Sequence, residues 1–155
     1  MSPPIDPGEL RDGDLRLTLA AYGPHRVHNV PTYHFRMVHT GTSEELGMIN
    51  LRVASTPHIE LYAGQIGYAV HEPHRGHRYA SRSVRLLVSL ARSLRLDPLW
   101  ITCDPDNLAS RRSLELAGAE LVEVVEVPET CAIRRSGHAQ KCRYRLDVAC
   151  VATTR

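Results

Sequence analysis

The amino-acid sequence predicts an α/β domain in which helices flank a mixed, mostly antiparallel sheet. Three observations support this class. Short segments in the first half of the chain alternate apolar and polar residues, which is typical of half-buried strands. From about residue 79 the apolar residues recur with the helical period. A strand–helix–strand order between residues 61 and 103 requires a right-handed parallel crossover, which makes the sheet mixed.

Four strands are expected before the first helix. In the first two, leucine or aromatic side chains alternate with arginine, threonine or histidine. The four strands are expected at residues 15–19, 33–37, 48–53 and 61–71. Gly64 and Gly67 within the fourth indicate a bulge or the close approach of a ligand to the backbone.

The second half predicts two helices and three strands. Residues 79–94 carry one apolar stripe, so we expect a helix packed on the sheet. Asp104-Pro105 supplies an N-cap and a first helical proline, and Gly118 is expected to end that second helix. Strands are expected at 99–103, 121–127 and 142–148, the last two antiparallel across a mobile loop at 128–140.

Length and composition limit the class of protein. The 155 residues, 43% of them hydrophobic, fit one domain. We expect a flexible N-terminus over 1–12, a single domain over 13–149 and a C-terminal tail over 150–155. The net charge of +2 does not argue for nucleic acid, and no apolar stretch is long enough for a membrane span. Four cysteines without a CxxC pair favour a reducing, cytoplasmic setting.

The turn between the fourth strand and the first helix predicts an anion site. The segment His74-Arg75-Gly76-His77-Arg78-Tyr79-Ala80 leads into a helix N-terminus, where backbone amides are free and the helix dipole favours negative charge. Gly76 permits close approach of a ligand, and Arg75 and Arg78 add charge-assisted donors. A diphosphate fits this chemistry.

Residues 67–70 followed by 75–80 resemble the acetyl-CoA motif of the GNAT superfamily, Gln/Arg-x-x-Gly-x-Gly/Ala. Arg75 and Ala80 match its outer positions, whereas Arg78 replaces the middle glycine. The segment 100–107, opening a helix that ends in Leu-Ala-Gly, is similar to the next strand and helix of the family. The resemblance covers about residues 15–148.

The resemblance implies a six- to seven-stranded sheet splayed between the fourth and fifth strands, with acetyl-CoA or another acyl-CoA in the gap. The pantetheine arm would pair with residues 68–70 as an extra strand does. Asn107 would lie near it, or would only cap its helix. The implied cofactor-binding residues are Tyr68, Ala69, Val70, Arg75, Gly76, His77, Arg78, Tyr79, Ala80, Ser81 and Asn107. A homodimer through the late strands is suggested by the same analogy.

The implied reaction is direct acyl transfer, most simply of acetyl, to a primary amine of a small molecule or peptide. Leu114 occupies the position where many relatives carry a tyrosine acid. The candidates for the general acid are therefore Tyr144, Tyr68 and Tyr79. The candidates for the general base are Glu60, His34, His58 or a chain of water molecules. Acceptor contacts are expected from residues 21–43 and 128–140 and carry no specific signal.

Other interpretations stay open. A chain with these departures from the motif is also consistent with an acyl-CoA-binding module that has lost turnover, or with an unrelated α/β domain that binds another phosphate ligand. Histidines 71, 74 and 77 are separated by a proline and a glycine that break a continuous helix, so no metal site is expected. Cys103 is expected to be a core residue and not a nucleophile.

Overall fold

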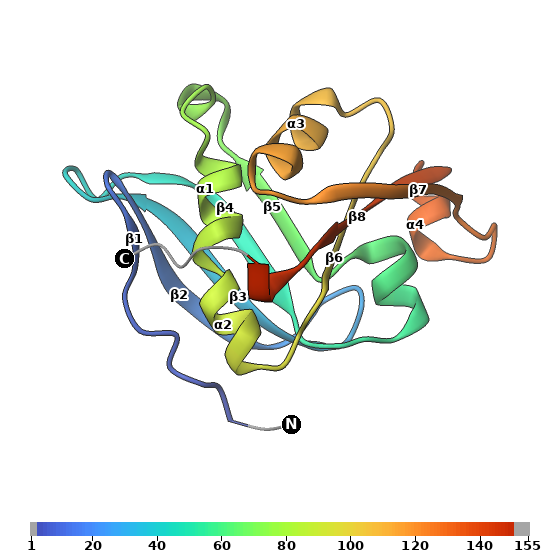
Figure 1. Cartoon of the computed structure of the whole chain (residues 1–155), viewed down its shortest axis with the longest axis horizontal. Helices are drawn as coiled ribbons and strands as arrows, with labels where there is room; N and C mark the ends of the chain where they lie inside the picture. The colour runs from blue at the N-terminus through green and yellow to red at the C-terminus, as the bar shows by residue number, and fades with distance from the viewer. Residues whose placement is uncertain (1–2, 151–155) are drawn as a thin grey trace.

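The computed structural model describes residues 3–150 and contains two sheets (Figure 1). The first contains β1 (Leu10–Asp12), β2 (Leu15–Pro24), β3 (Pro31–His39), β4 (Glu45–Arg52) and β5 (Ile66–Val70), in that order. The second contains β6 (Leu99–Cys103), β8 (Gln140–Leu146) and β7 (Glu120–Glu126), in that order. The helical segments are η1 (Ile59–Ala63), η2 (Glu72–His74), α1 (Tyr79–Leu86), α2 (Val88–Ser93), α3 (Leu108–Leu116), α4 (Ala132–Arg135) and η3 (Val148–Cys150).

The alternating segments form strands, as predicted, because each turns one apolar row toward α1 and α2. Leu15, Phe35 and Ile49 on successive strands are each at most 2% exposed. Val84 and Leu87 from the helical segment are fully buried in the same core. Burial of this kind contributes about 25 cal/mol for each Å² of apolar surface removed from water. The shared core therefore fixes α1 across the first sheet.

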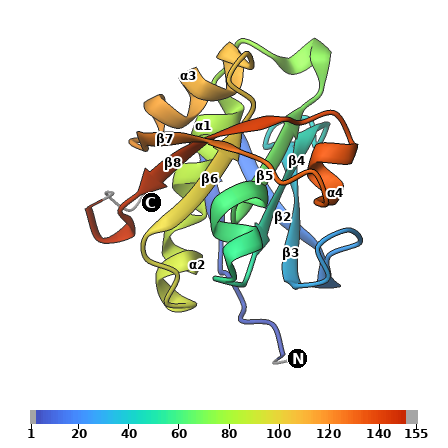
Figure 2. The ribbon, with the colours of Figure 1, turned by 90° about the vertical axis from the view of Figure 1, so that its right-hand side faces the viewer.

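The prediction of one mixed sheet is wrong, since every described strand pair is antiparallel. β5 and β6 face each other across the boundary between the sheets without forming a ladder (Figure 2). At the beginning of β5, the Gln65 amide donates to the Trp100 carbonyl over 2.7 Å. The Gln65 side-chain oxygen accepts the Trp100 amide over 2.8 Å, so a side chain takes the donor that a parallel partner strand would need.

Two predicted boundaries also differ at the ends of elements. Residues 61–63 belong to the π-helical turn η1 and not to the fourth strand, because the Ala63 carbonyl accepts from the Arg52 side chain and Gly64 ends the turn with φ +76°. Within the terminus expected to be flexible, Leu10–Asp12 form β1, and Leu10 is only 4% exposed. Residues 151–155 of the predicted tail lie outside the described residues.

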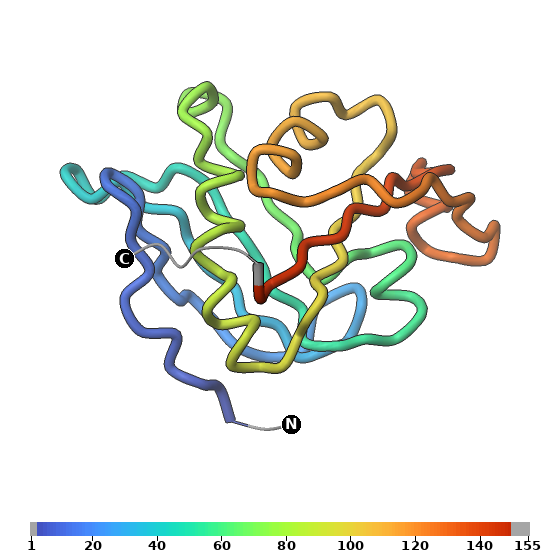
Figure 3. The backbone as a smooth tube through the Cα atoms, viewed as in Figure 1, coloured from blue at the N-terminus to red at the C-terminus, as the bar shows by residue number. Residues whose placement is uncertain are grey.

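The helices follow the predicted order with shifted limits, and Figure 3 traces the chain from β5 through α1 and α2 to β6. The single helix expected at 79–94 is interrupted at Leu87. The second helix begins at Leu108 because Asn107 caps it, accepting the Ser110 amide over 3.1 Å. The predicted cap, Asp104, instead pairs with Lys141. The loop at 128–140 contains α4. None of the described helices is long and apolar enough to cross a membrane.

Candidate functional site

A cavity of about 480 Å³ lies between β5, the turn before α1, and α3. We call it the β5 cavity. Its walls are Tyr68, Ala69, Val70, His74, Arg75, Gly76, Arg78, Tyr79, Ala80, Asn107, Ala109, Ser110 and Ser113. The structure therefore brings together every predicted cofactor residue except His77 and Ser81. A groove of about 580 Å³ along the N-terminal segment and β2 contains none of the predicted site residues.

The start of α1 presents unsatisfied donors to this cavity. No side chain caps the helix, and the amides of residues 76–81 donate to no acceptor within the described chain. Because four N–H groups at every helix start lack an intrahelical acceptor, they need a side chain, water or a ligand. The dipole of α1 adds partial positive charge at the same place. The predicted anion site thus has free donors, and four of their residues, Gly76, Arg78, Tyr79 and Ala80, line the β5 cavity.

The backbone conformation of Arg78 shows why the acetyl-CoA motif that this segment resembles has a glycine at the same position. Arg78 is the N-cap of α1 with φ +60°, in the left-handed region that costs a residue with a Cβ about 1–2 kcal/mol. Glycine adopts this conformation without that cost. Ser81 is buried and its Oγ donates to the Arg78 carbonyl over 3.1 Å, which supports the turn from behind. The Arg75 Nε donates to the Val70 carbonyl over 3.2 Å at the end of β5.

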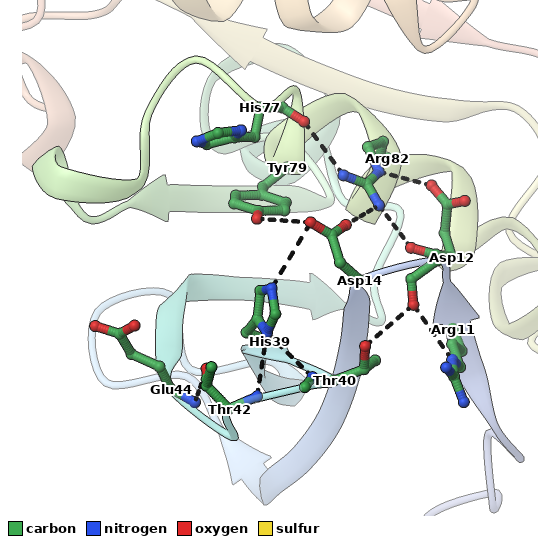
Figure 4. Close-up of polar contacts among 12 residues, drawn as sticks. Arg11, Asp12, Asp14, His39, Thr40, Thr42, Glu44, His77, Tyr79 and Arg82 are labelled. Carbon is green, nitrogen blue, oxygen red and sulfur yellow. Dashed lines mark hydrogen bonds and ion pairs between the residues drawn. The ribbon is translucent and has the colours of Figure 1, made fainter.

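A charged network holds the other side of the turn (Figure 4). Arg82 donates to Asp12 over 2.7 Å, to Asp14 over 2.6 Å and to the carbonyl of His77 over 3.3 Å. The Tyr79 hydroxyl donates to Asp14 over 3.1 Å. The hydrogen bond from Arg82 is the largest cause of a lowered pKa at Asp14. His77 therefore helps to fix the turn through its backbone, while the residue is exposed and its ring lies tilted against that of Tyr79, with 5.4 Å between the ring centroids.

Tyr68 lines the β5 cavity, and its hydroxyl lies 2.7 Å from the Ser110 Oγ. Burial raises the pKa of Tyr68 to about 12, so the phenol stays protonated at neutral pH. Tyr144 is fully buried, and its oxygen accepts from the Arg111 Nε over 3.1 Å. The Tyr79 hydroxyl is engaged by Asp14. Geometry thus separates the three acid candidates.

The base candidates lie outside the β5 cavity. Glu60 is on η1, and its backbone carbonyl accepts from the Arg143 Nε over 3.2 Å. The His34 ring lies 3.1 Å from the Asn50 side-chain oxygen, and the His58 ring lies 2.9 Å from that of His28. No described group of three or more His, Cys, Asp or Glu side chains has the geometry to hold a metal ion.

Sequence reasoning missed the wall that α3 contributes. Ser110 and Ser113 share one helix face with Asn107, at spacings of three residues, which is the signal that could have identified them. Leu114 is fully buried and leaves no hydroxyl at the position of the family tyrosine. Cys103 is 5% exposed in the core, and burial raises the pKa of its thiol to about 11, which confirms its expected role in the core.

Comparison with protein families places most of the chain in one of them. Residues 7–120 match the family model described as the acetyltransferase (GNAT) domain. A search of curated proteins found no match. The family match spans β1 to the start of β7 and therefore includes the β5 cavity.

Solved structures show the same fold at low identity. The ribosomal-protein-S5-alanine acetyltransferase from Vibrio fischeri has a TM-score of 0.66 and 12% identity, covering 93% of this chain and 98% of its own. A GNAT-family acetyltransferase from Bacillus anthracis has a TM-score of 0.58 and 18% identity, covering 75% of this chain. A structure from Vibrio cholerae, described as a ribosomal-protein-serine acetyltransferase, gives the same three values. The match spans only 66% and 64% of those last two chains.

Proposed function

Because the chain belongs to the family of GNAT acetyltransferase domains, we propose that it is an N-acyltransferase that transfers acetyl from acetyl-CoA directly to a primary amine. The observation that carries the proposal is the set of free amides at residues 76–81, of which Gly76, Arg78, Tyr79 and Ala80 line the β5 cavity. Family membership alone indicates the reaction class. The free amides give the chain's own means of binding the cosubstrate.

The diphosphate of acetyl-CoA is assigned to the start of α1. Backbone amides and the helix dipole supply most of the attraction, and Arg75 and Arg78 add charge at the rim. The network behind Arg82 keeps the turn open because it ties the His77 carbonyl to the β1–β2 turn. Preorganised donors of this kind bind without a large cost of ordering the loop.

The pantetheine arm is assigned to the space between β5 and β6. Among the described strands, β5 pairs only with β4, so its other edge at residues 68–70 is available to an extended ligand, except that the Val70 carbonyl already accepts from the Arg75 Nε. This assignment treats the boundary between the sheets as the splay of the fold. Asn107 acts here as the cap that starts α3, and so sets Ser110 beside Tyr68.

In the proposed reaction, the amine nitrogen forms a bond to the thioester carbonyl carbon and the carbon–sulfur bond then breaks. Holding the amine next to the thioester accelerates the reaction because the two groups no longer have to meet by diffusion. Tyr68 is assigned as the group that donates a hydrogen bond, and then its proton, to the departing thiolate. Glu60 does not line the cavity, so it would accept the proton of the amine only through a chain of water molecules.

The function is tested by two measurements on the purified protein. Isothermal titration calorimetry with acetyl-CoA measures binding, and a thiol reagent measures CoA release with a panel of small amines and peptides. Ribosomal-protein N-terminal peptides belong in the panel because similar structures are named for such acceptors. We expect binding and amine-dependent release. Absence of binding would contradict the proposal.

A second candidate function is an acyl-CoA-binding module without turnover. This candidate is favoured because Leu114 is buried where the family often has a tyrosine. Of the tyrosines described in the cavity wall, Tyr79 bonds to a carboxylate, and only Tyr68 then remains as an acid. Acetyl-CoA binding with no release of CoA for any amine would support this candidate over the enzyme.

A further inference from the structure

A second cavity, of about 280 Å³, lies between the β2–β3 loop, η1 and the β7–β8 loop. We call it the Arg52 cavity. Polar or charged side chains in its wall are His28, Arg52, Tyr62, Ser136, His138 and Lys141. Two of its three walls come from the segments in which the sequence places acceptor contacts. The cavity has no residue in common with the β5 cavity.

Arg52 is a buried cation with an incomplete set of partners. Only 9% of the residue is exposed, and its Nη1 donates to the carbonyls of Ala63 and Gly64 over 3.0 and 2.9 Å. The Nε is fully buried without a partner, so it lies out of reach of a ligand. No acceptor in the described chain contacts Nη2, and this N–H group is the one left for a charge-assisted bond to an anion.

A carboxylate that contacts two residues of the cavity wall already has partners of its own. Asp104 lies 2.9 Å from the Lys141 amine and 2.7 Å from the His138 ring. Burial, and then the charge of Arg52, lowers the pKa of His28 to about 4, so this ring is neutral at pH 7. Burial lowers the pKa of Arg52 only to about 10, so its charge persists. A buried charge without a counterion is unfavourable, and a bound anion would relieve that cost.

The guanidinium lies close to the proposed site of reaction. A Cβ built on Gly67 would lie 2.7 Å from the Arg52 Nη2, so the head group lies directly over Gly67 of β5. Tyr68 is the next residue, points to the opposite face of the strand and lines the β5 cavity. We assign the thioester to the end of the pantetheine arm beside Ala69 and Val70, which lie two to three residues from Gly67 along the strand, about 7–10 Å.

We propose that the Arg52 cavity binds the acidic group of the acceptor, so that the preferred substrates are primary amines carrying a carboxylate about 7–10 Å from the reacting nitrogen. This inference rests on the proposed acyltransferase function. It assigns Arg52 a role in substrate specificity. Polyamines and simple alkylamines are poor acceptors on this account, because they bring a positive charge or no charge to an uncompensated cation.

The test compares two acceptors of matched length, 6-aminohexanoate and 6-aminohexanamide. We expect kcat/KM with acetyl-CoA to favour the carboxylate by about tenfold to hundredfold, mainly through KM, because one charge-assisted pair is made or lost. Arg52→Met should abolish this preference, and Arg52→Lys should keep part of it. Arg112→Met is the matched control, since Arg112 is an exposed arginine on α3 with 67% side-chain exposure.

Calorimetry measures acetyl-CoA binding to every variant, and so distinguishes a failure of this inference from a failure of the proposed acyltransferase function. If wild-type protein binds no acetyl-CoA, the proposed function fails. If it transfers acetyl to both probes with equal efficiency, or if Arg52→Met keeps the preference, the inference is overturned. Saturation-transfer NMR of each probe with the CoA complex gives a reading without turnover. Equal binding of carboxylate and amide there would also overturn it.

Discussion

At the scale of single residues, the site combines strained backbone with ordinary polar contacts. Arg78 occupies the left-handed conformation at the position where the acetyl-CoA motif has glycine, and Tyr68 lines the β5 cavity with its hydroxyl 2.7 Å from the Ser110 Oγ. Both residues were identified from the local sequence, because a short motif specifies a turn and its helix. Arg52 was not, because its unpaired edge results from contacts with Gly67 and with the end of η1, which are distant in sequence.

Replacing Arg78 by glycine should stabilise the protein. Removing the left-handed strain gains about 1–2 kcal/mol, and the added flexibility of glycine in the unfolded chain costs about 0.5–1 kcal/mol. Urea denaturation should therefore show a rise of up to about 1.5 kcal/mol in unfolding free energy, and Arg78→Ala should show none. Acetyl-CoA affinity should change less than tenfold in both. A larger loss would mean that the guanidinium, not the backbone, anchors the diphosphate.

Tyr68→Phe tests the acid. We expect kcat to fall by about 10²- to 10⁴-fold, the range typical of a lost proton donor, with little change in the dissociation constant of acetyl-CoA. Tyr144→Phe is the control, since Tyr144 bonds to Arg111 within the core and lies outside the cavity. It should cost about 1 kcal/mol of stability and leave kcat within a few-fold. The reverse pattern in stopped-flow assays would reassign the acid.

At the scale of elements, the start of α1 depends on contacts with the turn between β1 and β2, which is distant in sequence. Arg82 joins α1 to the β1–β2 turn through Asp12 and Asp14 (Figure 4). The sequence predicted the helix and its anion-binding start but assigned residues 10–12 to a flexible terminus. Three residues are too short for a periodicity signal, and only pairing with β2 makes them a strand. Likewise, η1 was mistaken for strand because its carbonyl partners lie on β4 and β6.

Arg82→Met should loosen the turn. Because the ion pairs are partly exposed, we expect a loss of about 1 kcal/mol in unfolding free energy. Acetyl-CoA affinity should fall by more than stability alone explains, since the His77 carbonyl loses its donor. Calorimetry and urea denaturation measure the two effects. Arg85→Met on the same helix is the control, and equal losses of affinity in both variants would contradict the anchoring role.

At the scale of the whole molecule, two antiparallel sheets meet at the beginning of β5, and the proposed ligands approach from opposite faces of that strand. The α/β class and the order of elements were predictable, because periodicity reports which face of each segment is buried. The separation into two sheets was not, because it depends on the Gln65 side chain replacing a backbone partner of Trp100. The Arg52 cavity could not be predicted either, because its walls come from segments that are far apart in the sequence.

His28, in the wall of the Arg52 cavity, makes the stability of the protein depend on pH. The pKa of His28 is lowered to about 4, mainly by burial, so the folded protein disfavours its protonated form. The unfolded chain binds that proton near the ordinary value of about 6.5. The contribution of neutral His28 to the unfolding free energy should therefore be fully present above about pH 6.5 and decline as pH falls toward 4. Urea denaturation across this range should show the decline reduced in His28→Gln. An unchanged profile would exclude His28 as its source.

The central claim is that main-chain amides before and at the start of α1 bind the diphosphate of the cosubstrate. Two-dimensional ¹H–¹⁵N NMR titration tests it directly, with coenzyme A and with pantetheine, which lacks the diphosphate. We predict that the amide resonances of residues 76–81 shift strongly with coenzyme A and little with pantetheine, while residues 68–70 respond to both. Binding of coenzyme A that leaves the amides of 76–81 unshifted would contradict the account.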